Sequence, residues 1–240
     1  MDVVKQEIQI ADGNQKMPCH LAKPASGGPY PGVIVIMEAF GLNDNIRSIT
    51  DRFAAEGFVA IAPDIYFRQP NNVVGYNDLP NAMRLMQSVK DDEVTGDVQA
   101  AVNHLKSLKE VKPKFGITGF CMGGKIAFLT ASRVPDIGAS APYYGGGLVT
   151  PGASGKAPID YVGGLKAPVL AFFGGKDAFI PMDQVEKFKS TLQKAGKQAE
   201  VIVYEDADHG FMCDERPVYH PAHAKEAWEK TVAFFKKNLA

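Results

Sequence analysis

Short apolar runs alternate with amphipathic segments along the chain, and this alternation predicts the secondary structure. The run Gly32–Met37 is apolar throughout, the pattern of a strand that is buried on both faces. The segment Asn43–Glu56 repeats apolar residues at helical spacing and is followed by Gly57, where a helix-ending glycine belongs. The predicted strands are Val4–Ile10, Cys19–Ala22, Gly32–Met37, Phe58–Pro63, Lys114–Phe120, Ser140–Tyr144, Pro168–Phe173 and Glu200–Tyr204. The predicted helices are Asn43–Glu56, Asp92–Leu108, Met122–Arg133, Pro181–Ala195 and Pro221–Leu239.

Strands and helices in strict alternation are typical of an α/β fold. We expect a central, mostly parallel sheet of about eight strands with helices on both faces, in one domain over residues 1–240. Ligands bind such sheets at the carboxyl ends of the strands, so the loops that follow strands are the place to look for chemistry. Two long loops, Tyr66–Asn81 and Gly145–Lys166, either only connect elements or roof a pocket.

Composition and charge narrow the class of protein. The 26 basic and 27 acidic residues give a net charge of −1, which argues against nucleic-acid and anionic-membrane partners. No run approaches the ~20 apolar residues of a membrane helix, and the first residues do not have the pattern of a signal peptide. Three widely spaced cysteines, Cys19, Cys121 and Cys213, favour reduced thiols and a cytoplasmic location. Because no Cys/His cluster has the spacing of a zinc site, we expect no structural metal.

The strongest motif is Gly119-Phe120-Cys121-Met122-Gly123, which follows a predicted strand and opens a predicted helix. It matches the G-x-S-x-G nucleophile elbow with cysteine in place of serine. The sharp turn of such an elbow strains the central residue and requires small neighbours. It also places the Cys121 thiol at a helix N-terminus, where the helix dipole favours thiolate. The alternative is a glycine-rich turn that carries a buried, inert cysteine.

An acid and a histidine follow the next two predicted strands. Asp177 comes after Pro168–Phe173, and His209 comes after Glu200–Tyr204. With Cys121 they reproduce the chain order nucleophile, acid, base of α/β-hydrolases. The histidine would take the thiol proton and later protonate the leaving group, and the acid would fix its tautomer. Taken singly, Asp177 would be a helix cap and His209 a polar turn residue.

A third candidate segment follows the strand Gly32–Met37. In this fold that loop supplies one oxyanion-hole amide, here the backbone N–H of Ala39, and the second donor is the N–H of Met122. Glu38 is an acid directed towards the crevice that holds Cys121. The alternative for Glu38 is a solvated loop residue.

These residues resemble the dienelactone hydrolase (carboxymethylenebutenolidase) family. The resemblance covers nearly the whole chain: Glu38 to Asn43, Pro63 to Tyr66 with Arg68 and Gln69, Gly119 to Gly124, Tyr143 to Gly145, Asp177 to Pro181, and His209 to Phe211. It implies an α/β-hydrolase fold and a Cys121–His209–Asp177 triad. It also implies that Glu38 contacts the thiol and helps govern when the thiol ionises.

The resemblance extends in part to substrate binding. In this family arginines hold a lactone carboxylate, and Arg68 matches one of them. The second falls where this chain has Cys213, and the nearby Arg216 is a possible substitute. Tyr143 and Phe40 match pocket positions, or they are core aromatic residues.

The sequence therefore predicts an enzyme that hydrolyses small esters or lactones through Cys121 and a thioester acyl-enzyme, with no cofactor. We expect a monomer or a weak homodimer. One alternative is a broader carboxylesterase or thioesterase. Two others belong to different classes: a ligand-binding protein on the same fold, and a redox-sensing protein that uses an exposed Cys121 thiol.

Overall fold

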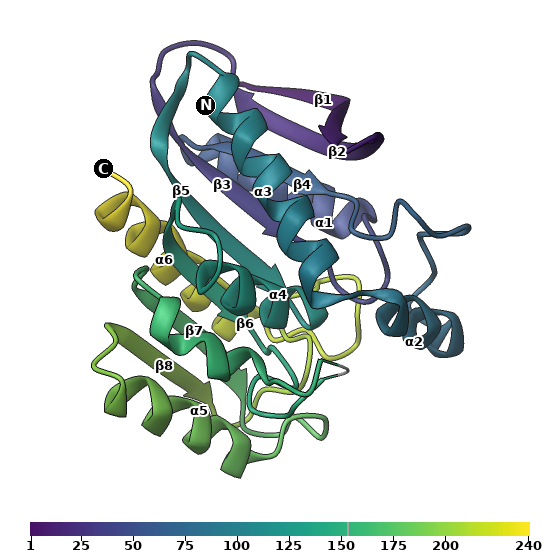
Figure 1. Cartoon of the computed structure of the whole chain (residues 1–240), viewed down its shortest axis with the longest axis vertical. Coiled ribbons are helices and arrows are strands. Elements are labelled where there is room, and N and C mark those ends of the chain that lie inside the picture. Colours follow the sequence, from purple (N-terminus) through teal and green to yellow (C-terminus); the bar gives the residue numbers. More distant parts are fainter. Residues whose placement is uncertain (153) are drawn as a thin grey trace.

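A computed structural model describes residues 1–152 and 154–240. Eight strands form one sheet in the order β1-β2-β4-β3-β5-β6-β7-β8 (Figure 1). The strands are β1 (Val3–Asp12), β2 (Gln15–Pro24), β3 (Tyr30–Ile36), β4 (Val59–Pro63), β5 (Val111–Phe120), β6 (Ile137–Tyr143), β7 (Val169–Gly174) and β8 (Ala199–Tyr204). The first two strands form an antiparallel hairpin, and β2 pairs antiparallel with β4. All other pairings are parallel, so the predicted fold class is confirmed.

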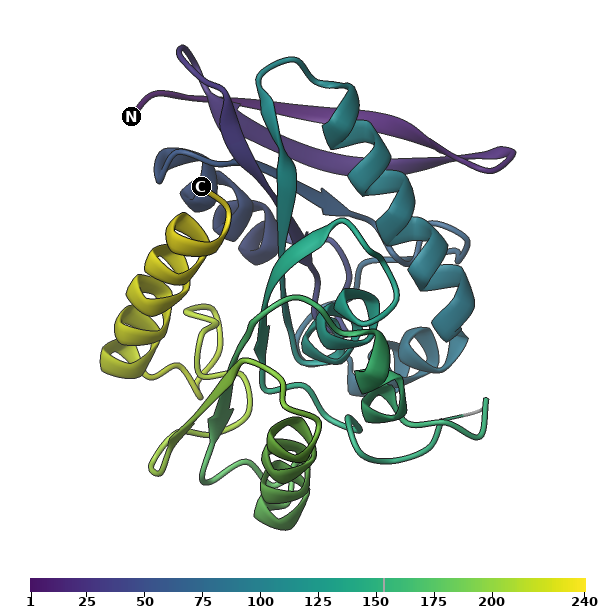
Figure 2. The same ribbon diagram turned by 60° about the vertical axis from the view of Figure 1, so that its left-hand side comes forward.

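Helices cover both faces of the sheet (Figures 1 and 2). They are α1 (Asp44–Ala55), α2 (Leu79–Ser88), α3 (Asp91–Ser107), α4 (Met122–Ala131), α5 (Met182–Lys194) and α6 (Pro221–Asn238), with a short 3-10 helix at Pro158–Gly164. On one face, Phe53 of α1 meets Trp228 of α6 with ring centroids 4.5 Å apart. On the other face, Phe128 of α4 meets Phe188 of α5 at 4.9 Å. These aromatic contacts pack the helices of each layer against one another over the apolar faces of the sheet.

Each predicted strand and helix falls on an observed element, and α2 is an addition. The loop expected at Tyr66–Asn81 ends in Asp78, which caps α2, and its Val74 N–H donates to the carbonyl of Phe40 at 3.1 Å. This loop therefore packs on the segment that follows β3. Of the other long loop, Gly145–Lys166, residue 153 lies outside the described residues. No helix in the described ranges has the length and apolarity that crossing a bilayer requires.

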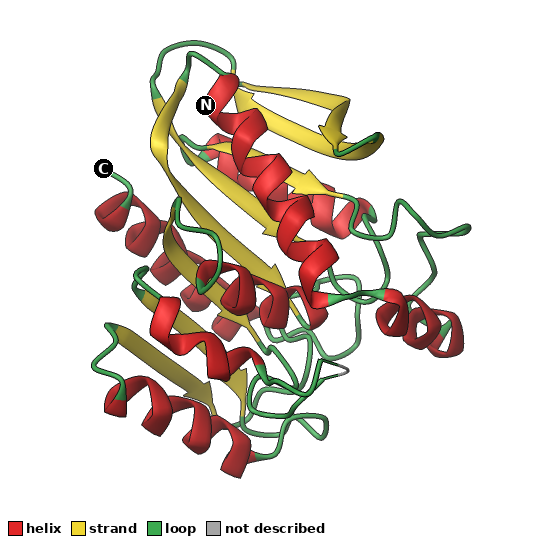
Figure 3. Cartoon of the chain, viewed as in Figure 1, coloured by secondary structure: helices red, strands yellow, loops and turns green. Residues whose placement is uncertain are grey.

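The strand register brings the predicted site together. Ile36 of β3 pairs with Gly119 of β5, and Phe120 pairs with Tyr143 of β6. The segments that follow β3, β5, β7 and β8 therefore leave the sheet at the same edge, where loops gather in Figure 3.

Candidate active site

Cys121 sits at a strained turn between β5 and α4. Its backbone has φ 56° and ψ −117°, in the left-handed region that L-residues rarely occupy. Holding a non-glycine residue there costs on the order of 1–3 kcal/mol. A Cβ on Gly119 would lie 2.1 Å from the carbonyl oxygen of Gly123, and a Cβ on Gly123 would lie 2.4 Å from that of Ile36. The two glycines of the motif are therefore sterically required.

The turn leaves the Cys121 thiol partly exposed at the N-terminus of a buried helix. By contrast, Cys19 and Cys213 are buried. Burial, together with the charge of the nearby Glu38 carboxyl group, raises the pKa of the Cys213 thiol to about 11. Burial also raises the pKa of Cys19. Of the three thiols, Cys121 alone combines access to solvent with a position at a helix N-terminus.

His209 and Asp177 form a buried pair. Nδ1 of His209 lies 2.7 Å from Oδ2 of Asp177. The other carboxylate oxygen accepts hydrogen bonds from the backbone N–H groups of Phe179 (2.8 Å) and Ile180 (3.2 Å). Because the carboxylate is fixed at both oxygens, it orients the imidazole ring.

The charge state of His209 reflects its neighbours. Burial of the ring lowers its pKa, whereas hydrogen bonding to Asp177 and to Cys121, together with their charges, raises it. The balance raises the pKa of His209 to about 10. The position between a carboxylate and a thiol thus favours the imidazolium, the partner that a thiolate requires.

Glu38 is completely buried just after β3. Among the described residues, neither of its carboxylate oxygens has a hydrogen-bond partner. Burial raises the pKa of Glu38, and the charges of Arg216 and His209 partly oppose that rise. The solvated-loop alternative for Glu38 is therefore wrong, and its carboxyl group lies within electrostatic reach of the catalytic candidate His209.

The two expected oxyanion donors, the N–H groups of Ala39 and Met122, lie on the segments that follow β3 and β5. Within the described ranges, no hydrogen bond leaves the backbone N–H of Ala39 or of Met122. The Tyr66 hydroxyl lies 3.2 Å from the carbonyl oxygen of Ala39 and 3.2 Å from Sδ of Met122. Tyr66 thus connects the two segments that carry these donors, a positioning role for which the sequence holds no local signal.

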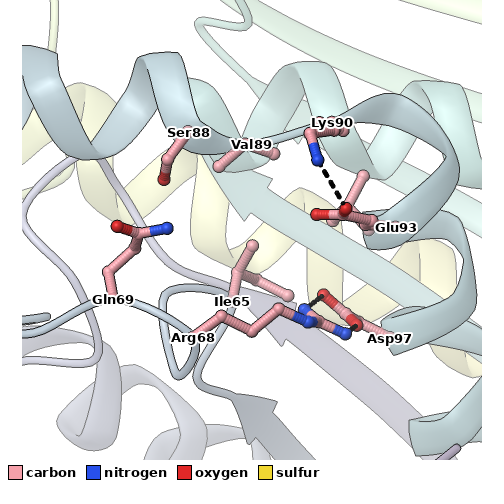
Figure 4. A pocket seen from close by; sticks show the side chains of 9 residues that line it. Ile65, Arg68, Gln69, Ser88, Val89, Lys90, Glu93 and Asp97 are labelled. Carbon is pink, nitrogen blue, oxygen red and sulfur yellow. Dashed lines mark hydrogen bonds and ion pairs between the residues drawn. The ribbon is translucent and has the colours of Figure 1, made fainter.

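Arg68 is occupied by acids of its own chain. Its guanidinium bonds both oxygens of the buried Asp97 (2.7 and 3.1 Å) and pairs with Asp12. Figure 4 shows Arg68 directed at Asp97 in a pocket whose lining includes Gln69 and Lys90 and none of the triad candidates. The structure thus argues against the expected role, because Arg68 could bind a substrate carboxylate only by leaving Asp97.

Arg216 is the arginine near the candidate site. Its guanidinium carbon lies 5.6 Å from the ring centre of Phe40 and 5.8 Å from that of Tyr76. It also lies against Gly210, the neighbour of His209, where an added Cβ would meet Nη1 at 2.2 Å. In the described part of the chain, no ion pair engages it. Arg216 therefore lies beside Phe40 and next to the segment that carries His209.

Tyr143 points away from the site. Its hydroxyl hydrogen-bonds the carbonyl of Ala227 (3.0 Å) and the Thr231 hydroxyl (2.5 Å), both on α6. Its ring is core packing, so the expectation of a substrate contact is not supported. Tyr144 and Phe179 instead flank His209, with ring centroids at 5.1 and 5.3 Å. Phe179 is 75% exposed, so an apolar ring lies beside His209 at the protein surface.

Comparisons with known proteins identify the family of this chain. The model of the "Dienelactone hydrolase family" matches residues 17–239. A Synechocystis protein named "Putative carboxymethylenebutenolidase" is 38% identical over 100% of this chain and 99% of its own. An Escherichia coli protein with the same name is 38% identical over 98% of this chain and 88% of its own.

A solved structure is similar over the same extent. The crystal structure titled "Putative Dienelactone Hydrolase" from Klebsiella pneumoniae superposes with a TM-score of 0.92 at 36% identity, covering 98% of this chain and 99% of that one. The elbow, the sheet order and these matches have one explanation: the chain belongs to the dienelactone hydrolase family of α/β-hydrolases.

Proposed function

We propose that this chain hydrolyses small carboxylate-bearing lactones or esters through a Cys121–His209–Asp177 triad. The observation that carries the proposal is a strained, partly exposed thiol, a histidine beside it and a buried carboxylate 2.7 Å from that histidine. A binding protein has no use for a nucleophile held under backbone strain. The relatives named carboxymethylenebutenolidase support the substrate class.

The reaction proceeds in two halves. Cys121 gives its thiol proton to His209 as Sγ adds to the substrate carbonyl, and the N–H groups of Ala39 and Met122 stabilise the resulting oxyanion. The C–O bond to the leaving oxygen breaks as His209 gives that oxygen a proton, which leaves a thioester on Cys121. Water then loses a proton to His209 and attacks the thioester, and the carboxylic acid leaves as the thiol is restored.

Arg216 supports the preference for a negatively charged substrate. It presents a guanidinium beside Phe40 and Tyr76 and has no carboxylate partner among the described residues. A guanidinium binds a carboxylate in bidentate fashion, which both orients the substrate and adds affinity. Arg68, by contrast, is held by Asp97.

A chromogenic-ester assay tests the proposal against its alternatives. The enzyme should turn over p-nitrophenyl acetate, and iodoacetamide should abolish that activity. Cys121→Ala should lower kcat by on the order of 10⁴–10⁶ while the protein stays folded. A matched control is Cys213→Ala, whose thiol is buried against Tyr76. A redox-sensing or ligand-binding protein would show no catalysed turnover. A broad esterase or thioesterase would hydrolyse neutral esters and thioesters at least as well as acidic lactones.

A further inference from the structure

Two histidines and an aspartate converge outside the active site. Asp206 lies just after β8, and His220 and His223 lie at the start of α6. One ligand atom from each of the three falls within 4.8 Å of the others. We propose that Asp206, His220 and His223 bind a divalent transition-metal ion that clamps the loop carrying His209.

The ligand atoms are close to the spacing that a metal imposes. Nε2 of His223 lies 2.6 Å from Oδ1 of Asp206, and Nε2 of His220 lies 3.4 Å from Oδ2. An ion bound at 2.0–2.2 Å from each ligand atom holds neighbouring ligand atoms roughly 3–3.5 Å apart. The pair with His220 already has that spacing, and His223 needs to move by less than about 1 Å. Imidazole nitrogen together with a carboxylate is a donor set typical of Zn²⁺, Ni²⁺ or Cu²⁺.

Neighbouring contacts hold the rings in place. The His220 and His223 rings stack with centroids 3.9 Å apart, and the Tyr204 ring stacks on His223 at 4.3 Å. Nδ1 of His220 accepts a long, 3.4 Å hydrogen bond from the His223 N–H, which leaves Nε2 facing Asp206. A metal on Nε2 of His220 would shift the ring proton to Nδ1, and the weak hydrogen bond from the His223 N–H would be lost. The side chains are 60% (Asp206), 32% (His220) and 21% (His223) exposed, so an ion from solution can reach them.

The ion would join the two ends of a functional loop. Asp206 opens the segment between β8 and α6, and His220 closes it. This segment carries His209 and Arg216, the proposed base and the proposed carboxylate-binding residue. In the described part of the chain, no hydrogen bond or ion pair links the three ligands to the triad candidates. The ion would therefore stabilise the loop without entering the reaction, and the site stands whether or not the proposed function is correct.

The test uses tag-free protein and Ni²⁺ as the probe. Titrations are made by calorimetry in a Cys121→Ser background, because the catalytic thiol would itself bind the metal. We expect one Ni²⁺ per chain, with binding at least ~10-fold weaker in each of Asp206→Asn, His220→Asn and His223→Gln. Asparagine at position 220 keeps a good helix N-cap, so that variant should fold. The matched control, Glu205→Gln, removes the adjacent exposed carboxylate and should leave the affinity unchanged.

Thermal unfolding supplies a second readout. At ~100-fold excess over Kd, Ni²⁺ should raise the Tm of the Cys121→Ser protein by about 5–10 °C. The same Ni²⁺ concentration should leave the Tm of His220→Asn nearly unchanged. The proposal is overturned if the parent shows no saturable one-to-one binding, or if all three variants keep the parent affinity. It is also overturned if Glu205→Gln weakens binding as much as they do, since that result would mean nonspecific attraction to surface charge.

Discussion

Asp177→Asn is the substitution that separates the orienting role of this residue from its place in the fold. Oδ1 of Asp177 accepts from two backbone N–H groups, and Oδ2 faces Nδ1 of His209 at 2.7 Å. An asparagine would keep its carbonyl oxygen on the two backbone donors, so its NH₂ would face His209. Because two N–H groups cannot pair, the ring would take the tautomer with its proton on Nε2. That tautomer cannot accept the proton of Cys121.

The expected fall in kcat is that of losing the general base while the other groups of the site stay in place. Wrong-tautomer substitutions of a triad aspartate lower kcat by roughly 10³–10⁴, which is about 4–5.5 kcal/mol at 1.36 kcal/mol per tenfold. The pKa of His209 should fall from about 10, because the hydrogen bond and the charge of Asp177 both raise it. The two backbone bonds persist, so the free energy of unfolding should change by no more than about 2 kcal/mol.

The assay is steady-state hydrolysis of p-nitrophenyl acetate at pH 7, with thermal unfolding measured on the same samples. The control is Asp208→Asn, one residue before the histidine, whose carboxylate accepts from the His209 backbone N–H at 2.7 Å. An amide oxygen can accept that same bond, so this variant should keep its activity within about threefold. A folded Asp177→Asn protein that retains more than a tenth of wild-type kcat would refute the reasoning.

Three other predictions follow from the same site. Iodoacetamide at pH 8 should label Cys121 at least ~100-fold faster than Cys213, whose pKa is raised to about 11; equal labelling in a peptide map would contradict the assigned environments. Burial raises the pKa of Glu38, so the folded state favours the protonated carboxyl group. The resulting contribution to the free energy of unfolding is fully present below about pH 4.5 and is lost as the pH rises through the raised pKa. Glu38→Gln should therefore be about 1–3 kcal/mol more stable than wild type at pH 8, with a smaller difference at pH 4.5, by urea denaturation. Arg216→Ala should raise KM for an acidic lactone by ~10–100-fold and leave KM for neutral esters nearly unchanged. Arg68→Ala should mainly lower Tm. The opposite pattern would mean that Arg68, and not Arg216, binds the substrate carboxylate.

Local patterns were enough to predict most of the fold. Strands such as Gly32–Met37 are apolar at every position because both faces of a parallel sheet are covered, and that pattern is visible in any short window. Helix α2 was missed because only Ala82 and Leu85 of its ten residues are buried, too few to produce a clear helical period. The positions of Cys121, Asp177 and His209 could be predicted because each lies in the segment that follows a strand.

Side-chain partners were harder to predict than elements. Arg68 looked available in the sequence, but its partner Asp97 lies on α3, and only the fold brings the two together. Tyr143 and Tyr144 are adjacent and chemically alike. β6 ends at Tyr143, whose hydroxyl bonds α6, and the ring nearer His209 belongs to Tyr144, which has a φ of 37°. Which of two adjacent tyrosines faces the site depends on backbone geometry at the strand end, and composition and spacing do not predict that geometry.

Direct observation of the acyl-enzyme is the most decisive measurement. A reaction with p-nitrophenyl acetate is quenched in acid during the first turnovers, and the intact protein and its peptides are weighed by mass spectrometry. The proposed mechanism predicts one acetyl group per chain, located on the Cys121 peptide and removed by neutral hydroxylamine as a thioester should be. Turnover with Cys121 unmodified at every time point, or acetyl on a different residue that disappears at the rate of turnover, would contradict it.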